Sequence, residues 1–231
     1  MSQRNEFFAK IALFKKEQEN IATSVIAILF FCSLVSRHTA IPLSKENIPL
    51  LLEVFPPKRR IELLSDVDSI YQGSLNDIIA LLRQHSIDPI FTGTIDSALH
   101  DFYPEFLRIQ DKEQWRERGT FYTDPRIALF MIQQIDDYWK EEYGFGLANA
   151  PSEQIRILDP ALGSGVFLHS LLSFIREQKK QEWKELPSAA KRSLWTEYLS
   201  DKDTGLLGRI LGIELDQTAL LLAEFRILWL L

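Results

Sequence analysis

The sequence contains little cysteine and little histidine. Among its 231 residues there are one cysteine, Cys32, and four histidines. Zinc and iron–sulfur sites are built from groups of Cys and His side chains, so we expect no metal site. A single cysteine forms no internal disulfide, which is typical of a reducing compartment. Because Cys32 lies in an apolar run, it is predicted to be an ordinary core residue.

An excess of positive charge is also missing. The formal net charge is −6 at pH 7, and neither half of the chain is basic. This balance argues against a protein that binds nucleic acid through its overall charge. Small basic clusters such as Lys58-Arg59-Arg60 are therefore predicted to be solvated surface.

No membrane-spanning segment is expected. The apolar run Ile21–Val35 is shorter than the about 20 residues that a spanning helix needs. The polar-rich segment before it, residues 1–20, is too long and too acidic for the start of a signal peptide. We predict that the run is a buried helix, that the protein does not associate with a membrane, and that it is cytoplasmic.

Residues 1–115 are predicted to form a helical N-terminal domain. From Asn5 to about Gln110, apolar residues recur at helical spacing, as in IATSVIAILFFCSLV and LNDIIALLRQH. The breaks between these segments fall at residues that end helices, namely Ile41-Pro42, Phe55-Pro56-Pro57, Gly73 and Asp88-Pro89.

Residues 116–231 begin with a different kind of segment, RERGTFYTDPRIALFMIQQ. Asp124 is a good N-cap and Pro125 a good first residue for a helix that runs from about Arg126 to Glu142. This helix carries an apolar stripe, which consists of Ile127, Phe130, Met131, Ile135 and Tyr138.

Two short β-like runs follow in residues 155–158 and 209–216. The first leads through a glycine-containing turn into a helix predicted over residues 165–181, and the second leads into another helix. This order is typical of the beginning of a Rossmann-like parallel sheet, which has a strand, a glycine turn, a helix and a second strand that ends in acidic residues. The predicted fold class is therefore α/β, with a helical domain in front of the sheet.

The stretch ILDPALGSGVFLHS predicts a ligand site at the end of the first strand. Gly163 and Gly165 permit a tight turn and a close approach of the backbone to a ligand. Asp159 would repel the pyrophosphate of a dinucleotide, whereas it would attract the ammonium and sulfonium of S-adenosylmethionine. Leu168 stands where the dinucleotide motif requires a third small residue. Glu214 can accept ribose hydroxyls, which both kinds of ligand possess.

Each of these features also has an interpretation without a ligand. Asp159-Pro160 fits an ordinary turn at a strand end, and Glu214 fits a surface acid. The segment Gly119–Thr123 fits a loop that packs its aromatic side chains and leads into a helix cap.

Three segments together resemble a known family. RGTFYTDPRIALFMIQQ, ILDPALGSGVFLHSLL and LLGRILGIELDQTALLLAEFRI, within about Arg116 to Leu228, are similar to motifs of adenine-specific DNA methyltransferases of bacterial restriction–modification systems. Large single-chain type II enzymes and type I modification subunits are the most similar in arrangement. The resemblance implies S-adenosylmethionine as cofactor, DNA as partner and the exocyclic amine of adenine as target.

The resemblance also assigns roles to individual residues. It implies that Tyr122 and Thr123 contact the methionine part of the cofactor and that Glu214 binds the ribose. The loop beneath the cofactor is implied to consist of Asp159, Ala161, Gly163 and Gly165. Phe167 is implied to pack beside the cofactor, and Asp216 to border the adenine pocket. One departure is visible, because Asp124 stands between the threonine and the proline that are adjacent in the family.

The catalytic motif of that family is missing from the sequence. In the family an Asn/Asp-Pro-Pro-aromatic motif accepts hydrogen bonds from the target amine and stacks on the flipped base. The single Pro-Pro, in VFPPKR, lies in the helical region after unsuitable residues, so we assign no catalytic residue. Two parallel strands alone would also leave an open, apolar sheet edge.

We therefore expect the chain to be the N-terminal, cofactor-binding fragment of a methyltransferase, inactive alone, either truncated or completed by a second polypeptide. Two alternatives stay open. One is a catalytically inactive remnant or interaction subunit, which the missing motif favours. The other is a nicotinamide-dependent Rossmann enzyme, against which Asp159 and Leu168 argue.

Overall fold

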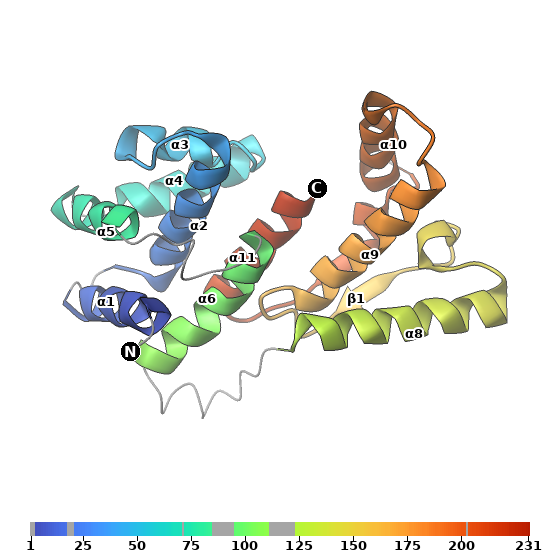
Figure 1. Cartoon of the computed structure of the whole chain (residues 1–231), viewed down its shortest axis with the longest axis horizontal. Helices are drawn as coiled ribbons and strands as arrows, with labels where there is room; N and C mark the ends of the chain where they lie inside the picture. The colour runs from blue at the N-terminus through green and yellow to red at the C-terminus, as the bar shows by residue number, and fades with distance from the viewer. Residues whose placement is uncertain (1–2, 18–20, 71, 85–94, 111–122, 202) are drawn as a thin grey trace.

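The computed structural model describes residues 3–17, 21–70, 72–84, 95–110, 123–201 and 203–231. The N-terminal part of this chain is helical (Figure 1). Its helices are α1 (Gln3–Glu17), α2 (Thr23–Thr39), the 3₁₀ turn η1 (Lys45–Asn47), α3 (Ile48–Leu51), α4 (Pro57–Asp68), α5 (Gln72–Gln84) and α6 (Ile95–Gln110). The prediction of a helical N-terminal region is thus confirmed for the described residues.

Helix α2 lies at the centre of these helices. All residues from Val25 to Val35 are buried, which is typical of a helix surrounded by other helices. The ring of Phe30 stacks on that of Phe102 in α6 at a centroid distance of 4.2 Å. Cys32 is among the buried residues, so the predictions of a core helix and a core cysteine are confirmed. None of the described helices combines the length and the apolarity that crossing a bilayer requires.

The second part of the chain contains a small parallel sheet among helices (Figure 1). Its elements are α8 (Pro125–Tyr143), the 3₁₀ turn η2 (Leu147–Asn149), β1 (Ile157–Asp159), α9 (Val166–Glu182), α10 (Ser188–Ser200), the 3₁₀ turn η3 (Leu206–Arg209), β2 (Ile210–Gly212) and α11 (Gln217–Leu230). The structure is compatible with the predicted α/β class, since the described chain is mostly helical and contains two parallel strands.

The second strand is shorter than predicted. β1 and β2 pair in parallel with Ile157 opposite Ile210 and Asp159 opposite Gly212. The predicted strand 209–216 ends at Gly212, and the next residue is bonded both to the last residue of β1 and to the loop after it. Ile213 donates its N–H to the Asp159 carbonyl oxygen at 2.9 Å and accepts from the Leu162 N–H at 3.0 Å. Residues 213–216 therefore connect the sheet to this loop.

The sheet is covered on one face. Ile157 and Ile210 pack in a cluster with residues of α9 and α11, such as Leu168 and Ala223. On the opposite face, 57% of Leu158 and 59% of Leu211 are exposed. Since parallel sheets are normally covered on both faces, this face is an unusual surface for a folded protein.

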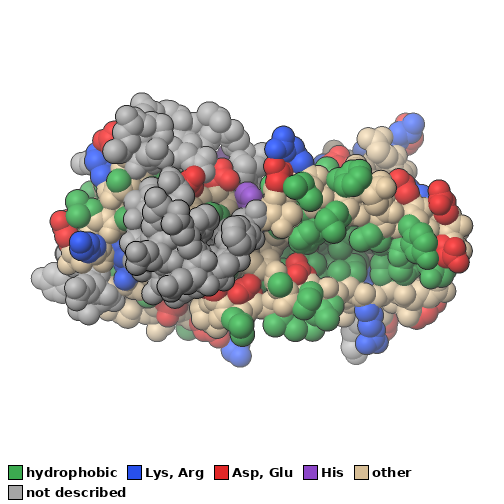
Figure 2. Space-filling view, turned by 90° about the horizontal axis from the view of Figure 1, so that it is seen from below, with side chains coloured by type: hydrophobic (Ala, Val, Ile, Leu, Met, Phe, Trp, Pro, Cys, Tyr) green, Lys and Arg blue, Asp and Glu red, His purple; other side chains and the backbone are tan. Residues whose placement is uncertain are grey.

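The apolar stripe of α8 is exposed, which corrects the simplest interpretation of its amphipathic pattern. All five stripe residues, Ile127, Phe130, Met131, Ile135 and Tyr138, are exposed, whereas Ala128, Ile132 and Asp136 are buried. Figure 2 shows hydrophobic side chains gathered on the half of the molecule where α8 lies in Figure 1. The buried carboxylate of Asp136 accepts from the Leu147 N–H at 2.7 Å and pairs with Lys140 at 2.6 Å, so the inward side of α8 includes a charged residue beside Ala128 and Ile132.

Helix α11 joins the two parts of the chain. It contacts α9 of the second part and both α2 and α6 of the N-terminal part. The ring of Phe225 stacks on that of Phe31 at 4.2 Å, and Leu222 is fully buried in the same core. The predicted division at residue 115 falls in the segment 111–122, outside the described residues, and remains a prediction.

Candidate functional site

The loop between β1 and α9 has the backbone that its two glycines permit. Gly163 and Gly165 have φ values of 54° and 77°, in the left-handed region that side chains disfavour. The Gly165 N–H donates to the Leu162 carbonyl oxygen at 2.8 Å, and α9 begins at the next residue. A β-carbon on Gly163 would meet no atom within 4 Å, so the backbone there is accessible to a ligand.

Glu214 holds this loop from the end of β2. Its Oε2 accepts from the Gly163 N–H at 2.7 Å. Its Oε1 accepts from the N–H groups of Leu215 and Asp216, both at 2.8 Å. A carboxylate offers about four accepting positions, so the backbone takes three and one stays open among these contacts. The structure therefore brings Glu214 to the glycine loop, while its predicted role at a ribose remains a prediction.

Asp159 has an acceptor that the described residues leave unused. Its Oδ1 accepts from the Ala161 N–H at 3.2 Å. Its Oδ2 is buried, and within the described part of the chain it has no hydrogen-bond partner. A buried carboxylate oxygen without a donor is costly, which indicates a place for a donor or cation supplied by a ligand.

A cavity of about 310 Å³ lies beside Asp159. Phe167 lines it from α9, Pro160 from the loop, and Met131 and Ile135 from α8. The walls are mainly apolar, with Asp159 as the acidic residue. Such a cavity fits a ligand that combines an apolar portion with a positively charged group.

The aromatic segment is described only in part. Tyr122 lies outside the described residues, whereas Thr123 is half-buried directly before α8. Asp124 caps this helix by accepting from the Arg126 N–H at 2.8 Å, and Pro125 occupies the first turn. The aspartate between threonine and proline therefore has a structural role as N-cap, as predicted.

Asp216 has a similar structural role in α11. Its Oδ1 accepts from the N–H groups of Thr218 at 2.9 Å and Ala219 at 3.0 Å, which caps the helix. Together with Asp159 and Glu214 it lies at the carboxyl ends of the two strands, where α/β sheets bind ligands. Its predicted role at an adenine pocket remains a prediction.

Most of the predicted site residues lie in the loop after β1 and after the end of β2, whereas Thr123 precedes α8 and Tyr122 lies outside the described residues. Asp159, Ala161, Gly163, Gly165 and Phe167 belong to the segment from β1 into α9, and Glu214 is bonded to it. Within the described ranges no group of three or more His, Cys, Asp or Glu side chains is placed to hold a metal ion. Sequence reasoning did not identify Arg226, which donates to the Ser164 carbonyl oxygen. Its signal was an arginine inside the apolar run LLLAEFRILWLL.

The comparison with protein families covers the part of the chain that contains these residues. The model of the N-6 DNA methylase family matches residues 95–228, which include α6, the glycine loop, both strands and most of α11. No curated protein and no solved structure matches the chain. Because the family match spans more than half of the sequence, the chain belongs to the N-6 DNA methylase family.

Proposed function

We propose that this chain is the S-adenosylmethionine-binding part of a DNA methyltransferase that modifies the exocyclic amine of adenine, in a restriction–modification system. The observation that carries the cofactor assignment is the unpartnered, buried Oδ2 of Asp159 beside an accessible glycine backbone. A carboxylate at this place attracts the ammonium of S-adenosylmethionine and repels a pyrophosphate. Family membership supports DNA as the substrate.

The residues of this chain bind and orient the cofactor, which supplies an activated methyl group on a sulfonium. Asp159 accepts from its ammonium, and the backbone from Ala161 to Gly165 lies beneath it. Glu214 uses its open accepting position for a ribose hydroxyl. The remaining roles are those that the resemblance implies: Phe167 packs beside the cofactor, Asp216 borders the adenine, and Tyr122 and Thr123 contact the methionine part.

The catalytic motif and the rest of the sheet come from additional polypeptide, either further along a longer chain or from a second protein. The uncovered face with Leu158 and Leu211 supports this proposal, because parallel sheets are stable when both faces are covered. So does the exposed stripe of α8, which offers apolar area for packing. Alone, this chain binds the cofactor and transfers no methyl group to DNA.

Cofactor binding by wild type and Gly163→Val, measured by calorimetry, tests the site. Valine adds a branched side chain at φ 54°, where the ligand approaches, so we expect affinity for S-adenosylmethionine to fall about 100-fold or more. Gly208→Val is a matched control, because a β-carbon there meets no atom within 4 Å and its φ is not positive. Equal affinity of wild type and Gly163→Val would show that the site assignment is wrong.

A second titration separates the alternatives. We expect no binding of NAD, and binding of NAD without S-adenosylmethionine would support the nicotinamide-dependent enzyme. Transfer of a radiolabelled methyl group to duplex DNA is expected to be absent for this chain alone. An interaction subunit without a cofactor is favoured if neither ligand binds, and the exposed stripe of α8 is then the surface to test.

A further inference from the structure

Arg226 is a charged residue in the interior. Only 1% of its surface is exposed, and it lies in the apolar helix α11. Its Nη1 donates to the Ser164 carbonyl oxygen at 2.8 Å and lies 3.4 Å from Ser164 Oγ. Burying a charged group is costly unless its hydrogen bonds are made, so this contact is a defined feature of the fold. Ser164 is equally buried, between the two left-handed glycines.

Three successive loop residues are each held by the segment 214–226. Glu214 accepts from the Gly163 N–H, and Arg226 donates to the Ser164 carbonyl. Gly165 rests against α11, since a β-carbon there would lie 2.9 Å from the Ala223 β-carbon. Positions 223 and 226 are three residues apart on one helix face, so both reach the same loop.

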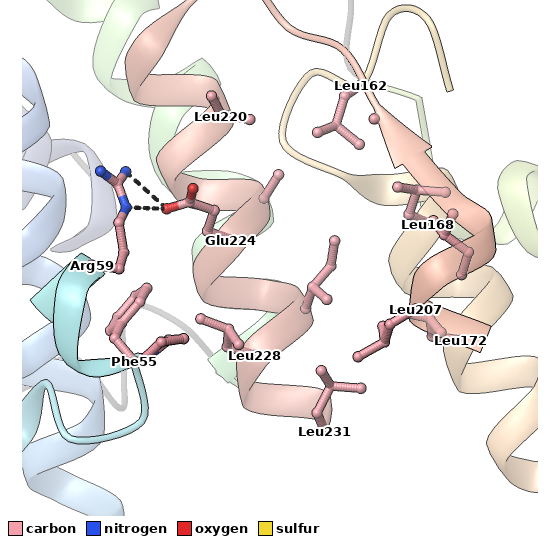
Figure 3. A pocket seen from close by; sticks show the side chains of 15 residues that line it. Phe55, Arg59, Leu162, Leu168, Leu172, Leu207, Leu220, Glu224, Leu228 and Leu231 are labelled. Atoms are coloured by element: carbon pink, nitrogen blue, oxygen red, sulfur yellow. Dashed lines mark hydrogen bonds and ion pairs between the residues drawn. The ribbon is translucent and has the colours of Figure 1, made fainter. Parts of the chain in front are cut away.

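The other side of α11 belongs to the core of the N-terminal helices. Phe225 stacks on Phe31 at 4.2 Å. Glu224 pairs with Arg59 of α4 at 2.9 Å, and Figure 3 shows this pair at the edge of a cavity of about 490 Å³. The N-terminal helices therefore contribute, together with α9, to the position of Arg226 and through it to that of the glycine loop.

The contact with Arg226 favours one orientation of the peptide unit between Ser164 and Gly165. The unit between Ser164 and Gly165 can rotate because glycine adopts both signs of φ at little cost. Its N–H is held by the Leu162 carbonyl and its carbonyl by Arg226. Without the guanidinium only the bond from the Gly165 N–H to Leu162 remains, so this peptide unit and the loop around it are held less firmly.

We infer that Arg226 is a positioning residue, which holds the glycine loop in its ligand-binding form without touching the ligand. The identity of the ligand, S-adenosylmethionine, rests on the proposed function, whereas the contact between Arg226 and Ser164 is independent of it. It makes the N-terminal helices part of the support of the cofactor site, because α11 belongs to both.

Three variants test the inference. Arg226→Met keeps a long unbranched side chain and removes the donors, and Arg226→Lys keeps the charge and a single donating nitrogen. Arg176→Met is the matched control, because Arg176 also donates to a backbone carbonyl, that of Leu230 at 2.6 Å, away from the loop. We expect Arg226→Met to weaken S-adenosylmethionine binding about 10- to 100-fold. Arg226→Lys should lie between it and wild type, and Arg176→Met within about 2-fold of wild type.

Hydrogen exchange provides a readout that does not depend on the ligand. In Arg226→Met, we expect faster exchange for a peptide covering residues 159–168 and unchanged exchange for α2. If wild type binds no S-adenosylmethionine, the proposed function is wrong and the exchange result still decides the role of Arg226. Wild-type affinity and wild-type loop exchange in Arg226→Met would overturn the inference.

If Arg226→Met also loses protection in α2, the decision rests on Arg226→Lys. An exchange increase confined to residues 159–168, with affinity reduced about 3-fold or more, supports the positioning role. Wild-type values for both readouts in Arg226→Lys would overturn it, as would an increase spread equally over the loop and α2.

Discussion

At the scale of single residues, the two loop glycines have different reasons to be glycine. Gly163 needs only a left-handed backbone, since a β-carbon there meets nothing within 4 Å. Gly165 needs the same backbone and also close packing, because its β-carbon would lie 2.9 Å from that of Ala223. The first glycine is therefore explained by its backbone conformation alone, and the second also by the fit of α11 against the loop.

Alanine at these two positions separates the two reasons. We expect Gly163→Ala to lower the free energy of unfolding by about 1–2 kcal/mol, from backbone strain alone. Gly165→Ala adds overpacking against Ala223 and should cost about 1–3 kcal/mol more. Urea unfolding of both variants measures the difference. Equal losses of unfolding free energy would show that α11 moves enough to accommodate an added methyl group at Gly165.

Asp124 makes stability depend on pH. The Arg126 side chain and the Arg126 N–H lower the pKa of Asp124 from 3.8 to about 2. A lowered folded-state pKa means that the stabilisation is complete above the unfolded pKa and is lost as pH falls through the folded one. Asn caps helices as well as Asp does, so Asp124→Asn removes mainly the charge.

The expected result is a difference in unfolding free energy between wild type and Asp124→Asn that shrinks on acidification. Urea unfolding at about pH 5 and about pH 3 measures it, because these values bracket the ordinary pKa of aspartate. A difference that stays constant between the two pH values would contradict the role of the Asp124 charge.

At the scale of elements, the helices were largely predictable and their partners were not. The helix predicted from Arg126 to Glu142 appears as Pro125–Tyr143, because the cap at Asp124 and the repeat of apolar residues are local signals. The burial of α8 was not predictable. Its inward face includes Asp136, which accepts from Leu147 and from Gln178 of α9, and these donors lie outside α8 where the local pattern does not reveal them.

The candidate site shows the same division. The glycines and acids at 159, 163, 165 and 214 could be read from the sequence, because turns and strand ends have local signatures. The bond from Gly163 to Glu214 and the contact of Arg226 with Ser164 join residues that are distant in the chain. Such pairings follow from the pairing of β2 with β1 and the packing of α11, which residue spacing alone does not specify.

Asp136 offers a test at this scale, since it connects α8, η2 and α9. It accepts from Leu147 at 2.7 Å and from Gln178 at 3.3 Å. Asp136→Asn places an amide donor among these donors, so we expect a loss of about 1–3 kcal/mol in the free energy of unfolding. The neighbouring Asp137→Asn is the control, because 64% of its side chain is exposed. Equal effects of the two variants would refute the structural role of Asp136.

At the scale of the whole molecule, α11 makes the two parts of the chain depend on each other. Removing the ring of Phe225 leaves a cavity against Phe31, and we expect Phe225→Ala to cost about 3–5 kcal/mol. Amide hydrogen exchange should accelerate both in α2 and in α9, which contacts α11 from the other side. Leu215→Ala is the control, because Leu215 is 94% exposed. Acceleration in only one of the two helices would show that the parts are independent.

The exposed apolar surface has its own consequence for association. Phe130 and Ile135 of α8 are 58% and 47% exposed, whereas Ile132 between them is 5% exposed. We expect Phe130→Glu and Ile135→Glu to reduce self-association in light scattering without lowering the unfolding temperature. Ile132→Glu should unfold the protein, because it buries a charge. Unchanged scattering in the first two variants would show that α8 is not an association surface.

The shared position of α11 also determines when the protein can fold during synthesis. Phe31 and its neighbours on α2 leave the ribosome early, whereas Phe225 and Leu222, which cover them, are synthesised much later. At ordinary rates of translation, the delay is on the order of 10 s or more. For that time the nascent helices expose aromatic side chains that the finished protein buries, and chaperones that bind such surfaces should engage this chain until α11 has emerged.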